Sequence, residues 1–213
     1  MRPFVTISRQ AGAGGHALAD SLIVAFEHQD DRDVFGGWQV FDKELCDIVA
    51  EDPKYSSAFS ALLAEEYDTK TRDFIRQIFG STIDQDVLAH EVFRVVSAVA
   101  SMGKCIILGR AGNEVTRGLD HRFSIRLIAT EAVRNLGMGD YYGLDELAAR
   151  REARRLDESR SRLLRSHFHV DIEDPTRYDV TWNTGQVSMN VMADSVVVAI
   201  KHIIATAQPA SPK

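Results

Sequence analysis

The sequence predicts an α/β protein of three layers, in which a parallel sheet of about five strands lies between helices. Three features indicate this fold. Short apolar runs alternate along the 213 residues with longer segments of helical periodicity, which is the order that builds parallel sheets. A glycine cluster directly follows the first apolar run. The hydrophobic content of 45% and the charged content of 26% are those of a soluble globular domain with a full core.

Five segments have the composition of strands. Four are apolar runs and the fifth is weaker; in order they are 4–8, 38–41, 104–108, 123–129 and 178–183. Seven segments between and after them show helical periodicity, and these are 15–28, 43–51, 56–79, 83–101, 131–136, 144–167 and 188–206. Gly36-Gly37 and Gly103 mark turns into strands, whereas Asp52-Pro53 and Asp174-Pro175 mark loops.

The helical segments interrupt the strand–helix alternation at two places. One insertion, at about residues 54–101, follows the second strand, and an arginine-rich region, at about 137–174, precedes the fifth. We predict a single domain over residues 1–207, in which the first insertion binds a phosphoryl acceptor and the second forms a lid over a triphosphate donor, excluding water. Residues 208–213 contain two prolines and are expected to form a flexible tail.

Composition excludes several classes of protein. A formal net charge of −6 argues against wholesale binding of nucleic acid or of an anionic membrane. No apolar run approaches the ~20 residues that span a bilayer, and the N-terminus enters a strand without a signal-peptide pattern. Cys46 and Cys105 lie far apart in apolar surroundings, which favours reduced, buried thiols over a disulfide or a metal cluster. We therefore expect a cytoplasmic protein.

The segment 4–16 carries the strongest functional signal. Its order of strand, glycine loop and amphipathic helix is that of a P-loop, which turns backbone N–H groups and a helix N-terminus towards a phosphate. Registered on G-x-x-x-x-G-K-[ST], Gly14 holds the second glycine, while Arg9, Gly15 and His16 replace the first glycine, the lysine and the Ser/Thr. A tight turn without a ligand is the alternative. The place after the first strand favours phosphate binding, by Ala11, Gly12, Ala13, Gly14, Gly15 and His16.

Positive charge for phosphoryl transfer has two sources in this sequence. Arginine suits the task because its planar fork matches phosphate oxygens. Arg9 ends the first strand and could supply the charge of the absent lysine. The segment 150–165 carries seven arginines, of which Arg151, Arg154, Arg162 and Arg165 fall near one helical face. That face is either a lid surface or a solvated face with ion pairs. RNA binding is a third interpretation, which the sequence favours less.

Two polar residues follow strands at the edge where ligands bind in parallel sheets. Arg110 comes directly after the strand 104–108, and Asp42 ends the strand 38–41. Residues just past the carboxyl ends of parallel strands face the ligand crevice. Asp42 is also placed to cap the helix expected after it, and the two roles are compatible.

Together these residues resemble the cytidylate kinase-like family of P-loop proteins, relatives of bacterial cytidylate kinase, over nearly the whole chain. The resemblance rests on the motifs I-S-R-Q…G-A-G-G, F-D-K-E, I-I-L-G-R, D-x-x-R and Y-D-V-T-W-N-T. It implies a three-layer P-loop NTPase fold with acceptor-binding and lid insertions. In cytidylate kinases a Gly-Arg-Asp motif and an Asp-x-x-Arg motif lie near the bound CMP, so Arg110, Asp157 and Arg160 take those places. Ala111 stands where these kinases have the aspartate.

From the residues and the resemblance we expect an ATP- and Mg²⁺-dependent kinase whose acceptor is a nucleoside monophosphate such as CMP or dCMP. Arg9, Arg154 and Arg160 are expected to neutralise charge on the transferred group. Arg110 and Asp157 would orient the acceptor, and Asp42 would hold an acceptor hydroxyl or water on Mg²⁺. The alternatives are a small-metabolite kinase and a non-catalytic nucleotide-binding regulator. The expected partners are a nucleotide and a small acceptor, with neither nucleic acid nor membrane, and the protein is a monomer or a homodimer.

Overall fold

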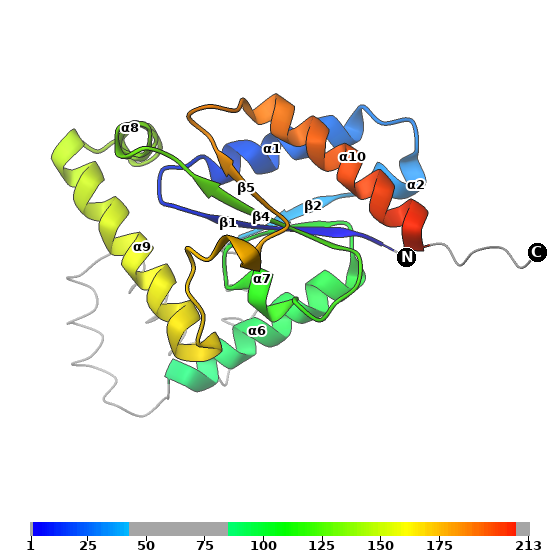
Figure 1. Cartoon of the computed structure of the whole chain (residues 1–213), viewed down its shortest axis with the longest axis horizontal. Coiled ribbons are helices and arrows are strands. Elements are labelled where there is room, and N and C mark those ends of the chain that lie inside the picture. Colours follow the sequence, from blue (N-terminus) through cyan, green and yellow to red (C-terminus); the bar gives the residue numbers. More distant parts are fainter. Residues whose placement is uncertain (1, 43–84, 208–213) are drawn as a thin grey trace, which may run out of the picture.

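The computed structural model describes residues 2–42 and 85–207, which form three layers around one sheet (Figure 1). Five parallel strands pair in the order β2-β3-β1-β4-β5. Their bounds are β1 Phe4–Arg9, β2 Gln39–Phe41, β3 Cys105–Leu108, β4 Arg122–Ile128 and β5 Val180–Asn183. The α/β class, the parallel sheet and its five strands are thus confirmed.

Helices cover both faces of the sheet, and two more lie along its carboxyl edge (Figure 1). One face carries α1 (Gly15–Glu27) and α10 (Met189–Ala207), and the other carries α6 (Gln85–Met102) and α7 (Gly112–Val115). At the carboxyl edge α8 (Glu131–Tyr142) packs against the long α9 (Glu146–Phe168). Two short elements, α2 (Arg32–Phe35) and the 3-10 helix η1 (Pro175–Arg177), complete the described part.

The central position of β1 determines where a ligand can bind. From β1 the chain moves to one side of the sheet for β2 and β3, and to the other side for β4 and β5. In open α/β sheets the ligand crevice lies outside the carboxyl ends of the strands at such a reversal. The loop after β1, the glycine loop, therefore lies at the mouth of this crevice.

Alternate residues of the central strands face opposite helical layers, as a parallel sheet buried on both faces requires. Val5 and Ile7 belong to an apolar cluster formed with α1 and α10. Phe4 and Ile107 belong to a second, smaller cluster formed with α6. Side chains on both faces of β1, the strand that precedes the glycine loop, are therefore packed in the core.

One helix differs clearly from the sequence prediction. The pattern indicated a helix over 131–136, whereas α8 continues to Tyr142 through Gly137 and Gly139. Glycine disfavours a helix interior by about 1 kcal/mol relative to alanine. Tertiary packing outweighs this preference, because Met138 is buried against α9 and the glycine loop. The short elements α2, α7 and η1 were also missed.

Several sequence predictions fall outside the described residues. These are the helices expected over 43–51 and 56–79, most of the insertion at 54–101, the tail 208–213 and Cys46. Cys105 is buried, and burial raises the pKa of its thiol to about 12, so it is an unreactive core residue. Within the described ranges α10 is long and apolar enough to cross a membrane, but it packs against α1 through Met192, Val196 and Ile200 as a core helix.

Candidate active site

The glycine loop leaves the first-turn amides of α1 without a side-chain cap. Gly14 is the N-cap residue, with the left-handed φ of 81° that glycine adopts readily. The first helical bond runs from the Leu18 N–H to the Gly14 carbonyl, at 3.0 Å. The N–H groups of Gly15, His16 and Ala17 precede that bond, so they stand at the positive end of the helix. This is the geometry in which a helix binds an anion.

A pocket of about 380 Å³ opens over these amides. It is lined from the loop, β2, α8 and α9 by Arg9, Gln10, Ala11, Gly12, Gly14, Gly15, His16, Ala17, Asp42, Gly137, Met138, Asp140, Tyr141, Tyr142, Leu156 and Arg160. Most of the residues predicted to bind phosphate are therefore together in one pocket. Ala13 is the exception, since it is buried in the core beneath the loop.

Arg9 crosses the position at which a P-loop carries its lysine. A Cβ atom added to Gly15 would lie 3.2 Å from Arg9 Cγ and 3.3 Å from Arg9 Cδ. The guanidinium then passes over Gly109, where an added Cβ would collide with Arg9 Nη1. One guanidinium nitrogen lies 3.6 Å from Asp42 Oδ1. Arg9 thus fills the space beside residue 15 and carries a positive charge along the pocket wall.

Asp42 is an ionised carboxylate held by positive groups. His16 Nε2 lies 2.9 Å from Asp42 Oδ2, so the residue at the Ser/Thr position of the loop contacts the end of β2. Burial by itself raises the pKa of Asp42. The hydrogen bond from His16 and the charges of Arg9 and Arg110 outweigh burial and bring this pKa down from 3.8 to about 2. Asp42 therefore remains an anion at any working pH.

The depressed pKa of Asp42 predicts a specific dependence of stability on pH. Because the folded pKa, about 2, lies below the unfolded value of 3.8, the stabilisation is complete above the unfolded value and is lost as pH falls through the folded value. We expect wild type to exceed Asp42→Asn in free energy of unfolding by about 2 kcal/mol near neutral pH. Urea unfolding of both proteins between about pH 6 and pH 3 measures the margin. A margin that stays constant or grows on acidification would contradict this assignment.

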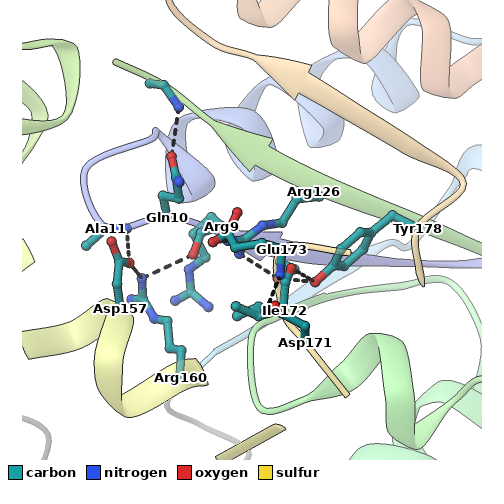
Figure 2. A network of polar contacts seen from close by, with 12 residues as sticks. Arg9, Gln10, Ala11, Arg126, Asp157, Arg160, Asp171, Ile172, Glu173 and Tyr178 are labelled. Atoms are coloured by element: carbon teal, nitrogen blue, oxygen red, sulfur yellow. Dashed lines mark hydrogen bonds and ion pairs between the residues drawn. The ribbon is translucent and has the colours of Figure 1, made fainter. Parts of the chain in front are cut away.

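A clamp from α8 and α9 holds the peptide units at the start of the loop. Asp157 Oδ1 accepts from the Ala11 N–H at 2.7 Å, and Arg134 Nε donates to the Ala11 carbonyl at 2.9 Å. Arg134 also pairs with Asp157. Arg160 lies 3.6 Å from that carboxylate and 3.3 Å from the Arg9 carbonyl (Figure 2). Asp157, predicted to bind the acceptor, is in this structure a partner of the loop backbone.

The glycine loop and α8 approach each other more closely than side chains would permit. A Cβ atom on Gly12, whose φ is +76°, would lie 2.8 Å from the carbonyl carbon of Arg134 and closer still to its oxygen. A Cβ atom on Gly137 would lie 2.5 Å from the Gly12 carbonyl oxygen. Two glycines on different elements therefore allow the contact, and α8 forms one wall of the pocket.

The predicted arginine face of α9 is solvent-exposed. Arg151, Arg154, Arg162 and Arg165 are all exposed, and none of them lines the pocket. Asp157 and Arg160 lie on the face of α9 that meets the loop, close to the buried Leu156. For those four arginines the structure favours the solvated-face interpretation, and it does not bring Arg154 to the site.

The turn after β3 places Arg110 near Asp42, although Arg110 does not line the pocket. Arg110 and Ala111 both adopt left-handed φ angles, 52° and 54°. Two successive non-glycine residues in this region are unusual, and such backbone strain gathers at functional sites. The charge of Arg110 helps to lower the pKa of Asp42, which locates it on the β2–β3 side of the glycine loop.

Sequence reasoning missed three features of the site. Arg134 and the tyrosines at the end of α8 lie in a segment that the pattern assigned to a shorter helix and the region after it. Arg126 is 3% exposed, donates to Ser8 Oγ at 3.0 Å and pairs with Glu173 at 2.6 Å (Figure 2). It joins β4 to the end of β1 and to the segment after α9. The sequence did indicate this residue, because Arg126 lies within an apolar strand run, and an arginine buried in a sheet needs polar or charged partners.

Comparisons with known proteins identify the family of the chain and similar folds. The profile of the cytidylate kinase-like family matches residues 4–186. No curated protein matches the chain. Among solved structures, an uncharacterised protein from Eubacterium ventriosum has a TM-score of 0.66 at 19% identity, covering 94% of this chain and 99% of its own. TT1252 from Thermus thermophilus has a TM-score of 0.51 at 14% identity, covering 98% and 100%. At these identities the similarity shows the fold alone.

Proposed function

Since the chain belongs to the cytidylate kinase-like family, we propose that it transfers the γ-phosphoryl group of ATP to a small acceptor, a nucleoside monophosphate such as CMP or dCMP. Family membership supports nucleotide-dependent phosphoryl transfer in general and does not specify the acceptor. The proposal of ATP as donor and of a monophosphate as acceptor rests on the pocket, together with the resemblance of its motifs to those of cytidylate kinases.

One observation carries the proposal: uncapped amides at the start of α1 share a pocket with the guanidinium groups of Arg9 and Arg160. Phosphoryl transfer requires mainly positioning and charge stabilisation from the protein. The amides of Gly15, His16 and Ala17 would hold the donor phosphates through the backbone. Arg9, at the carboxyl end of β1, would supply the charge that a P-loop lysine supplies elsewhere.

The remaining residues divide between metal, acceptor and support. Mg²⁺ would supply positive charge that offsets the negative charge of the phosphates. In the described parts of the chain no three His, Cys, Asp or Glu side chains gather to hold a metal, so the ionised Asp42 would contact the ion through water. Arg110, beside Asp42, would orient the acceptor. Asp157 and Arg134 would keep the loop in its binding conformation through Ala11.

Specific residues favour each of two alternative functions. Ala111 is 5% exposed and packs with Leu164 and Ile172, so this position supplies no carboxylate to read a base. That favours a small-metabolite kinase on the same scaffold. The absence of a lysine at Gly15 favours a regulator that binds a nucleotide without catalysis, but two arginines in the pocket argue against it, because a sensor has no need of cations for a transition state.

An acceptor screen separates these functions. The full chain is incubated with ATP–Mg²⁺ and, one at a time, with nucleoside monophosphates and small hydroxylated metabolites, and ADP release is measured. We expect ADP release that depends on CMP or dCMP. Dependence on a metabolite alone would establish the second kinase class. Saturable ATP binding without acceptor-dependent release under any condition would contradict the kinase proposal and support the regulator.

A further inference from the structure

Two aromatic rings at the end of α8 stand on the wall of the phosphate pocket. Tyr141 is 62% exposed and Tyr142 is 39% exposed, and both line the pocket. Their rings meet edge to face, with centroids 4.7 Å apart. An aromatic ring this exposed to water, next to the first-turn amides of α1, offers a planar surface to a ligand.

His16 connects this surface to the phosphate cradle. Its backbone N–H belongs to the first turn of α1, and its imidazole stacks on Tyr141 with ring centroids 5.2 Å apart and planes inclined by 12°. His16 therefore links the first-turn amides of α1 to the ring of Tyr141. A ligand with phosphates on these amides has its next group within reach of an aromatic face.

We infer that Tyr141, supported by Tyr142, stacks the nucleobase of the phosphoryl donor; this inference rests on the proposed function. A nucleotide combines phosphates with a planar π system, and the pocket combines uncapped amides with exposed aromatic rings. Stacking tolerates any base, since every base has a π face. Specificity would come from the edge, where Asp140 also lines the pocket and its carboxylate accepts hydrogen bonds from an exocyclic amino group such as that of adenine.

The order of the strands assigns the tyrosines to the donor and not to the acceptor. Asp42 and Arg110 follow β2 and β3, on one side of β1, whereas α8 follows β4, on the other side. The acceptor residues and the tyrosines therefore approach the glycine loop from opposite halves of the sheet. The imidazole of His16 lies between them, since it contacts Asp42 and stacks on Tyr141. A donor with its phosphates on the loop amides would place its base on the α8 side, against the part of the Tyr141 ring that His16 leaves exposed.

Binding of ATP and of inorganic tripolyphosphate, each with Mg²⁺, tests this inference by calorimetry on the full chain. Removing one base-stacking aromatic side chain typically weakens binding by about tenfold or more. We expect Tyr141→Ala to lose about that factor for ATP and to bind tripolyphosphate, which has no base, as wild type does. Tyr141→Phe keeps the ring and should bind ATP as wild type does.

Leu136→Ala is the matched control, because Leu136 is 70% exposed on the same helix and does not line the pocket. It should change neither affinity. Equal weakening of both ligands by Tyr141→Ala, or unchanged ATP affinity, would overturn the inference while the phosphate loop stands. If wild type binds ATP but not tripolyphosphate, the phosphate-loop proposal fails and the base site survives. If wild type binds neither ligand, both fail.

Discussion

Replacing Arg9 with alanine is expected to lower phosphoryl transfer by a factor on the order of 10² or more, the scale observed when one preorganised charge-stabilising donor is removed. The reason is the course of the Arg9 side chain, which lines the pocket, runs beside Gly15 and ends with its guanidinium over Gly109. The competing interpretation is that Arg9 only braces the loop through its ion pair with Asp42. ATP turnover and thermal unfolding, measured on the same preparation, distinguish the two.

A second substitution makes this test sharper. In the Arg9→Ala background the space beside residue 15 becomes open, so Gly15→Lys can introduce the usual P-loop lysine and should recover part of the lost transfer. In the wild-type background the same lysine would meet the Arg9 side chain and should impair the site. Arg154→Ala serves as the control, since Arg154 is exposed and lies outside the pocket. A destabilised but fully active Arg9→Ala protein would remove Arg9 from the mechanism.

Gly12→Ala is expected to be the most damaging single methyl group that can be added to this site. A left-handed φ of +76° disfavours alanine by about 1–2 kcal/mol. The added Cβ would also overlap the backbone of Arg134, and overpacking of this kind costs about 1–3 kcal/mol more. We expect the variant to lose stability in urea unfolding and to lose ATP affinity, because α8 and the loop must move apart.

Gly37→Ala isolates the steric part of that effect. Gly37 has the same φ of +76°, but nothing lies within 4 Å of an added Cβ. Both variants share the conformational penalty, and only Gly12→Ala has the overlap with α8. Equal losses of stability in the two proteins would mean that the contact between the loop and α8 has no energetic weight.

Much of the fold was predictable because strong local patterns and tertiary structure agree. The apolar runs marked all five strands to within two residues at each end, and the glycines after Arg9 correctly placed the loop between β1 and α1. The order of the strands was not predicted, since periodicity carries no information on which strands pair. The end of α8 was misjudged because Gly137 weakens the helical pattern, whereas in three dimensions it allows the contact with Gly12.

Site residues that follow the end of a strand could be predicted from the sequence. Site residues on helices could not, because their place depends on which face of the helix meets the glycine loop. Asp42 and the amides of the loop are where the parallel sheet required them to be. On α9, Arg154 and Arg160 are six residues apart and so point to different sides of a helix of 3.6 residues per turn, but periodicity does not tell which side meets the glycine loop. Only burial of Leu156 against α8 and the loop decides that Arg160 faces the pocket.

Because Gly12 and Gly137 allow the close contact between the glycine loop and α8, these two segments can be replaced by those of a related protein only together. A loop transplanted from another P-loop protein would bring its own residue at position 12, and any side chain there would meet the backbone of the resident α8. Conversely, a helix transplanted in place of α8 would have to carry a glycine at position 137. Loop and α8 therefore form one module, although more than a hundred residues separate them in the chain. Recombination that divides this module would break the site even where both parental sequences are functional.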